Sequence, residues 1–201
     1  MTKRGLGVLV ALMFLTPFVV SNVETTFALW SQAALGWGPL ENGYAYSFMG
    51  LIAVLVQGGS IGPLTRMFGE RALVIAGPVL IAIGMAVLPI LGGVVALGVS
   101  LFLIVAGVCI TTPSINSLVS RRAAGHERGA LLGIAQAAGG LARIAGPTWG
   151  GFAFVQFGRD WPYFTGAAVM VAAFVLARRV EAPTLDDGVL FSNCSIVQTL
   201  R

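Results

Sequence analysis

Six long apolar segments fill most of this 201-residue chain and constrain its fold more than any other feature. A helix needs about 20 apolar residues to cross the hydrocarbon core of a bilayer, and each segment is close to that length or longer. Only a helix or a closed barrel satisfies its backbone hydrogen bonds inside lipid. The sequence therefore predicts an all-α membrane protein with six transmembrane helices, at residues 6–30, 43–64, 72–91, 94–119, 129–156 and 161–177.

The basic residues lie almost entirely in alternate gaps between these segments. With the N-terminus in the cytoplasm, the outside gaps contain only Arg159. Cytoplasmic loops are enriched in Lys and Arg, so this asymmetry predicts a multi-pass protein of the plasma membrane (the inner membrane of a bacterium) with both termini cytoplasmic. The inside gaps contain Lys3, Arg4, Arg66, Arg71, Arg121, Arg122, Arg128, Arg178 and Arg179.

Composition excludes several other classes of protein. Charged residues make up 10% of the chain and the mean hydropathy is +0.89, whereas soluble domains are about a quarter charged. The lipid bilayer is therefore an expected partner, and nucleic acid is not, because no basic run is interleaved with aromatic residues. No spacing predicts a metal site, and no catalytic or nucleotide-binding motif is present, so we expect neither an enzyme nor a bound cofactor.

Glycine and proline suggest an internal repeat within a single domain at residues 1–180. Gly62-Pro63 recurs 84 residues later as Gly146-Pro147, and Phe68-Gly69 recurs 89 residues later as Phe157-Gly158. Three crossings reverse the chain direction, so segments one to three and four to six would be two inverted three-helix repeats. In a chain with 27 glycines, chance explains these dipeptides equally well. Residues 181–201 are polar and predict a poorly ordered cytoplasmic tail.

The stretch between the second and third segments resembles the cytoplasmic-loop motif G-x-L-x-D-x-x-G-x-R/K of the major facilitator superfamily. It differs at the acidic position, which is basic here, as is usual in the weaker copy between helices eight and nine of a twelve-helix transporter. We expect its two glycines to allow close approach to neighbouring helices. The motif positions are Gly62, Leu64, Arg66, Gly69 and Arg71.

The fifth segment is similar to the antiporter motif of the same family, with Ala142 in place of one glycine. This motif implies close helix packing at Gly133, Gly146, Pro147, Gly150 and Gly151. The resemblance covers roughly residues 5–180 and implies that the chain corresponds to helices seven to twelve, the C-terminal half of a drug-efflux-like member.

The resemblance implies membrane transport: half of a proton-coupled secondary transporter that exports small organic compounds by alternating access. The driving force would be the proton gradient. Alternating access needs two domains around a central site, so the expected partners are a small-molecule substrate and a second six-helix domain or chain. The alternative is a truncated or non-transporting module that only assembles with another membrane protein.

Helical periodicity selects candidate residues for a substrate or proton pathway. On the fifth segment, Gln136 and Arg143 share a stripe with Gly140, opposite Ile134 and Leu141. A charge deep in a membrane helix is costly unless it is paired or wetted, so Arg143 should face the bundle interior. Its alternative role is structural, in bonds to carbonyl groups near the Gly-Pro break.

Polar side chains of the other segments complete this set. Glu24 lies in the outer part of the first segment, and we expect it to pair with Arg143, because pairing lowers the cost of burying both charges. The alternative is an interfacial Glu24. The remaining candidates are Asn22, which lies beside the stripe of Glu24, and Gln57 and Asn116, for which helix–helix hydrogen bonding is the alternative role.

The asymmetry of the basic residues yields a prediction about topology. Arg66, Arg121 and Arg178 should lie in the cytoplasm, and Gly36 and Arg159 outside. Single cysteines at these positions should react accordingly with an impermeant thiol reagent added to intact cells. Labelling of position 121 from outside would overturn the assignment.

Overall fold

The computed structural model describes residues 3–91, 93–122 and 128–179, and it is helical over nearly all of them. The proposed tail, 181–201, lies outside the described residues. Six α-helices and one π-helical segment follow each other along the chain: α1 (Lys3–Leu35), α2 (Pro39–Leu55), η1 (Val56–Ser60), α3 (Ile61–Leu91), α4 (Val94–Arg122), α5 (Arg128–Phe157) and α6 (Trp161–Arg178).

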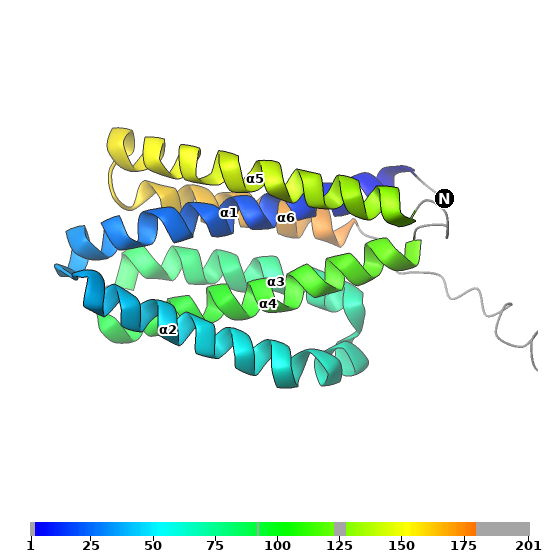
Figure 1. Ribbon diagram of the computed structural model, residues 1–201, viewed down its shortest axis with the longest axis horizontal. Coiled ribbons are helices and arrows are strands. Elements are labelled where there is room, and N and C mark those ends of the chain that lie inside the picture. Colours follow the sequence, from blue (N-terminus) through cyan, green and yellow to red (C-terminus); the bar gives the residue numbers. More distant parts are fainter. Residues whose placement is uncertain (1–2, 92, 123–127, 180–201) are drawn as a thin grey trace, which may run out of the picture.

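The helices run roughly parallel to the long axis of the molecule and alternate in direction (Figure 1). Four of the described helices are long and apolar enough to cross a membrane: Gly7–Leu35, Ile61–Ile90, Val94–Ser120 and Trp161–Arg178. As an α-helix, α2 ends after 17 residues because η1 follows it. The sequence of α5 is rich in glycine and contains Gln136 and Arg143, which lower its apolar character, but it runs along the full bundle beside α1 (Figure 1).

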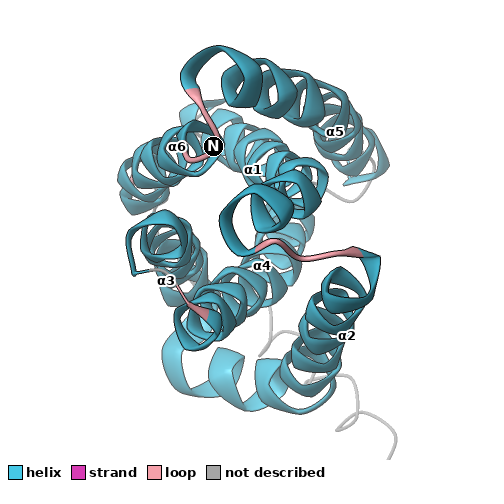
Figure 2. Ribbon diagram, turned by 90° about the vertical axis from the view of Figure 1, so that its left-hand side faces the viewer, coloured by secondary structure: helices cyan, strands magenta, loops and turns pink. Residues whose placement is uncertain are grey.

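The arrangement of the helices agrees with the inverted repeat. Viewed from one end, α3 and α6 lie on one side, α1 and α4 in the middle, and α2 and α5 on the other side (Figure 2). The α3–α4 contact has its counterpart in α6–α1, and the α1–α5 contact in α4–α2. Exchanging α1 with α4, α2 with α5 and α3 with α6 therefore reproduces the pattern of contacts, as two three-helix repeats require.

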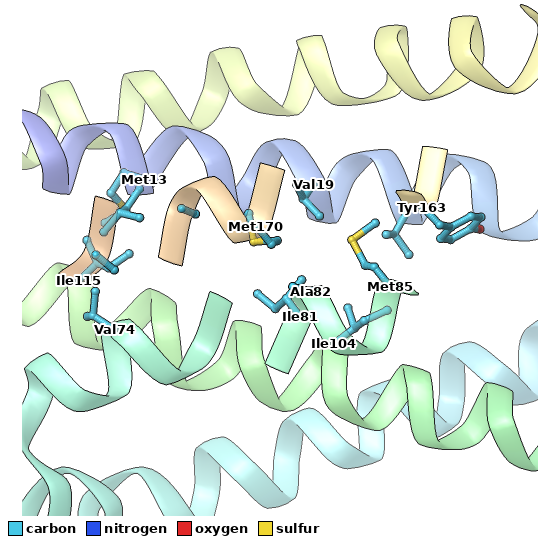
Figure 3. Packing of buried hydrophobic residues seen from close by; sticks show 14 of the residues in the cluster. Met13, Val19, Val74, Ile81, Ala82, Met85, Ile104, Ile115, Tyr163 and Met170 are labelled. Carbon is cyan, nitrogen blue, oxygen red and sulfur yellow. The ribbon is translucent and has the colours of Figure 1, made fainter. Parts of the chain in front are cut away.

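The main core fills the space between α1 and α6 on one side and α3 and α4 on the other. Its side chains include Val19, Ile81, Met85 and Met170, all essentially inaccessible (Figure 3). Lipid tails are as apolar as these side chains, so close packing, more than exclusion from water, holds such helices together.

Glycines bring α3 and α4 into backbone contact. A Cβ atom at Gly107 would lie 2.8 Å from the carbonyl oxygen of Gly77, and one at Gly84 would lie 2.8 Å from that of Ser100. No larger residue fits at either position without displacing the partner helix. Sequence reasoning missed these glycines because they belong to no recognised motif. Their signal is the seven-residue spacing of Gly77 and Gly84, which places both on one face of α3.

Polar contacts join the C-terminal end of α1 to the residues that connect α5 and α6. Arg159 donates from Nη1 to the carbonyl of Ala33 at 2.9 Å, and Trp30 donates from Nε1 to Asp160 Oδ1 at 2.8 Å. The Ala33 carbonyl lies in the last turn of α1, where carbonyl groups have no intrahelical partner. The single basic residue of the predicted outside gaps therefore caps a helix end.

The predicted loop between the second and third segments is wrong. The chain stays helical through η1 and on to Phe68, and the direction changes at one residue, Gly69, before the helix resumes. Gly69 has φ +76° and ψ 156°, a conformation essentially restricted to glycine. Pro63 lacks a backbone donor and follows η1, whose wider turn changes the hydrogen-bond pattern there without ending the helix.

The glycines of this motif therefore do not act by close approach. A Cβ atom at Gly62 or at Gly69 would meet no atom within 4 Å. Gly62 lies within the helix, and Gly69 is needed for its positive φ. The conformational freedom of one residue, and not tight packing, explains glycine at position 69.

This difference can be tested with one substitution at two sites. Gly69→Ala should destabilise the folded chain by about 1–3 kcal/mol, because alanine is strained at this backbone conformation. Gly62→Ala should leave stability unchanged or raise it slightly, since alanine favours a helix over glycine by about 1 kcal/mol. Thermal unfolding in detergent measures both, and equal midpoints for the two variants would contradict the assignment.

Candidate functional site

One exposed face of α5 carries the polar stripe expected from the sequence. Gln136, Gly140 and Arg143 are exposed, and Ile134 and Leu141 are exposed on the opposite side. Between these two faces lies a strip of small buried residues, of which Gly146 and Gly150 contact α1: Ala135, Ala142, Gly146, Gly150 and Ala153. The helix therefore presents one face for lipid and a separate polar face, with a packing seam between them.

A small pocket lies where this polar face meets α1 and α4. It has a volume of about 200 Å³, and we call it the polar pocket. Arg143 contributes the cation and Glu24 the carboxylate. Its remaining lining residues are Thr16, Pro17, Val20, Ser21, Val108 and Thr112. The hydroxyl of Thr16 is buried and has no hydrogen-bond partner among the described residues.

A larger pocket of about 330 Å³ lies next to it, between α1, α2 and α4, and we call it the apolar pocket. It shares Val20, Glu24 and Val108 with the polar pocket. Its other lining residues are Val23, Tyr46, Met49, Gly50, Ala53, Gln57, Ile104, Val105 and Cys109. Glu24 therefore borders two adjoining pockets of different chemistry.

The structure places Glu24 and Arg143 on the same pocket but not in an ion pair. Both side chains are exposed, and no salt bridge joins them among the described residues. The expected pairing is therefore wrong for this conformation. The physical reason is that both groups line an accessible pocket, where neither charge needs the other to lower its burial cost.

Two hydrogen bonds fix polar side chains of the apolar pocket. Gln57 Nε2 donates to Cys109 Sγ at 3.2 Å, which ties η1 to α4. Tyr46 donates from its hydroxyl to the backbone carbonyl of Glu24 at 3.1 Å, which ties α2 to α1. Sequence reasoning missed Tyr46, because a tyrosine near a helix start carries no periodic signal that distinguishes it from an interfacial aromatic residue.

Asn22 and Asn116 do not line either pocket. Asn22 is inaccessible between α1, α5 and α6, and its Nδ2 donates to the carbonyl of Pro162 at 2.9 Å. This hydrogen bond joins α1 to α6, a role that the sequence analysis did not assign to Asn22. Asn116 is half-buried on α4, and its Oδ1 has no hydrogen-bond partner among the described residues.

The residues of the loop motif lie at the other end of the bundle from Arg159. Arg66 and Arg71 are exposed, and Leu64 is half-buried. A neighbouring acid contacts α4: Glu70 Oε1 accepts a hydrogen bond from Ser117 of α4 at 2.6 Å. The motif comparison assigned no role to Glu70, because it is not one of the motif positions.

The helix-packing motif divides into contacting and open positions. A Cβ atom at Gly146 would lie 2.5 Å from the carbonyl oxygen of Phe18, and one at Gly150 would meet Asn22 Oδ1. Gly133 and Gly151 have no neighbouring atom within 4 Å of the Cβ position, and Pro147 is half-buried. Among the glycines of this motif, Gly146 and Gly150 therefore bring α5 close to α1, and Gly133 and Gly151 do not.

Comparison with known proteins identifies the family of this arrangement. The family described as Major Facilitator Superfamily matches residues 8–189. Major facilitator superfamily domain-containing protein 10 of Bos taurus is 28% identical over 90% of this chain and 39% of its own length. Tetracycline resistance protein, class C, of Escherichia coli is 27% identical over 88% of this chain and 46% of its own length.

Solved structures agree in fold. The crystal structure of the human organic anion transporter MFSD10 (TETRAN) superposes with a TM-score of 0.79 at 22% identity, over 88% of this chain and 42% of that chain. A crystal structure of peptide transporter POT in complex with sulfate superposes with a TM-score of 0.77 at 26% identity, over 87% of this chain and 37% of that chain. The chain spans less than half the length of each of these relatives.

The packing seam yields a prediction with a control on the same helix. Gly146→Ala should destabilise the chain by about 1–3 kcal/mol, because the methyl group forces α5 away from α1. Gly151→Ala should be neutral or slightly stabilising, since its Cβ position is open. Thermal unfolding in detergent compares the two variants. A similar loss of stability in both would mean that the close approach of α5 to α1 at Gly146 does not determine stability.

The absence of an ion pair also yields a prediction. Glu24→Gln and Arg143→Gln should each change the free energy of unfolding by less than about 0.5 kcal/mol, because exposed groups outside a network contribute little. In the double variant the two changes should add. Chemical or thermal unfolding of all three variants measures this, and strong non-additivity would show that the residues interact in solution.

Proposed function

The chain belongs to the Major Facilitator Superfamily, and on that basis we propose that it forms the C-terminal half of a proton-coupled secondary transporter. In this proposal it works with a second six-helix domain or chain and exports small organic compounds by alternating access. Its length relative to its relatives and its likeness to tetracycline resistance proteins support this. We further propose that the membrane is a bacterial inner membrane.

One observation carries the proposal: an accessible face of the bundle combines a carboxylate, a guanidinium and two adjoining pockets. Glu24 lies on α1, which is long and apolar enough to span a membrane, and Arg143 lies on α5 beside it; a charge facing lipid in a spanning helix costs at least about 2.5–3.5 kcal/mol. Such a face is stable when it borders water or another protein domain. A second six-helix domain placed over α1, α2, α4 and α5 would enclose these pockets between two halves, as a central transport site requires.

Glu24 is the proposed proton-binding residue. It is the acid that both pockets share, so its charge affects an occupant of either one. A proton and a substrate that compete for one carboxylate are coupled, because each lowers the occupancy of the other. Arg143, across the polar pocket, would interact with anionic groups or with Glu24 in another conformation.

The test is transport in everted membrane vesicles that contain this chain together with the first six-helix half of a tetracycline resistance protein. We expect tetracycline uptake that needs both chains and an imposed pH gradient, and that Glu24→Gln lowers at least about tenfold, the size of one lost charged hydrogen bond. Leu141→Ala, on the face opposite the polar stripe, is the control and should transport normally.

The outcomes separate the candidate functions. Gradient-driven uptake that survives Glu24→Gln would exclude this residue as the proton site. Absence of uptake despite normal assembly of both chains would favour a module whose function is assembly with another membrane protein.

A further inference from the structure

The apolar pocket has the size and lining of a small-molecule subsite. Its volume of about 330 Å³ lies at the lower end of the range for ligand pockets, about 300–1,000 Å³. Aliphatic side chains and Met49 form most of its wall, contributed by three helices. Glu24 is its one charged lining residue. A ligand there must therefore be mainly apolar, with few polar groups.

The hydrogen bonds within the pocket leave mostly acceptors for a ligand. The Tyr46 hydroxyl hydrogen is directed to the Glu24 backbone carbonyl, and one amide hydrogen of Gln57 is directed to Cys109 Sγ. The acceptors that remain are the Glu24 carboxylate, the Gln57 carbonyl oxygen and a lone pair of Tyr46, and the Cys109 thiol adds one weak donor. Apart from the second amide hydrogen of Gln57, the polar side chains of Tyr46, Gln57 and Glu24 present acceptors.

We propose that the apolar pocket binds lipophilic amines, with the apolar body against α2 and α4 and the ammonium group at Glu24. The inference deepens the proposed function, on which its role in transport rests. An ammonium group supplies donors that match the free acceptors, and its charge matches the carboxylate. An organic anion finds no cation here, because Arg143 lines the polar pocket on the other side of the shared residues.

Cys109 acts as a positioning residue in this assignment. Its sulfur accepts from Gln57 and thereby holds the Gln57 side chain in the orientation described, although sulfur is a weak acceptor. Cys109→Ala removes this partner and should weaken amine binding without affecting binding of a neutral analogue. Cys109→Ser retains an acceptor at the same position and should restore the preference for amine.

The thiol also provides a direct readout of pocket occupancy. The chain has two cysteines, so Cys194→Ser leaves Cys109 as the single thiol. The detergent-solubilised 201-residue chain is treated with N-ethylmaleimide, and alkylation of Cys109 is followed by mass spectrometry. Three probes with the same ring system are compared: 1-naphthylmethylamine, 1-naphthalenemethanol and 1-naphthaleneacetic acid. The thermal unfolding midpoint with each probe is the second measurement, because a bound ligand raises it.

We expect the amine to slow alkylation about fivefold more than the alcohol and the acid do, the size of one charge-assisted contact at an accessible site. Glu24→Gln should remove this preference. Glu41→Gln, which neutralises a carboxylate on α2 outside the pocket, should retain it. The amine should also raise the unfolding midpoint when Glu24 is present, as in Glu41→Gln, and should not do so in Glu24→Gln. This measurement decides the result if Cys109 does not react.

Equal protection by the three probes, or preference for the amine in Glu24→Gln, would overturn the proposal. So would the absence of both protection and a shift in the unfolding midpoint. Because the experiment needs neither a second domain nor a pH gradient, its failure leaves the transport proposal standing. Selective amine binding without transport in the vesicle experiment would refute only the proposed transport function.

Discussion

Close backbone contact at glycine residues holds this bundle together, and the position of every other group depends on it. Gly146 and Gly150 of α5 lie directly on the backbone and side chains of α1, and Gly77 and Gly107 join α3 to α4 in the same way. Inside a membrane, burial of apolar side chains supplies little net driving force, because lipid is equally apolar. Short distances between helices gain dispersion energy instead, and only the smallest residues permit them.

The α1–α5 contact determines where the polar groups lie. When the small residues of α5 face α1, the stripe that contains Gln136 and Arg143 is turned about a quarter of a revolution away, toward α4. The same contact uses the face of α1 that contains Asn22, which is therefore buried and bonded to Pro162. Glu24 lies on the neighbouring face of α1 and borders the pockets.

The pockets consequently lie where helices are separated by side chains larger than glycine. Beside α4 the α-helix α2 gives way to η1, whose Gln57 donates a hydrogen bond to Cys109 of α4. A π-helical turn disturbs the regular hydrogen-bond pattern and is frequent at functional sites. The pair α2–α4, with few contacts, and the closely packed pair α1–α5 are related by the repeat, so one architecture provides a closely packed half and an open half.

The sequence by itself determined the helical fold, the number of helices and the separation of polar from lipid-facing stripes on α5. These properties follow from composition and from the 3.6-residue period, which operate within one helix. The tertiary structure decided which polar residues meet. Asn22 and Glu24 are two residues apart on α1, yet the first is inaccessible and the second borders both pockets. It also placed Glu24 and Arg143 on one pocket without an ion pair, and it replaced a predicted loop by a turn at Gly69. Such outcomes depend on distances between helices and on backbone angles at single residues, which the pattern of apolar and polar positions does not contain.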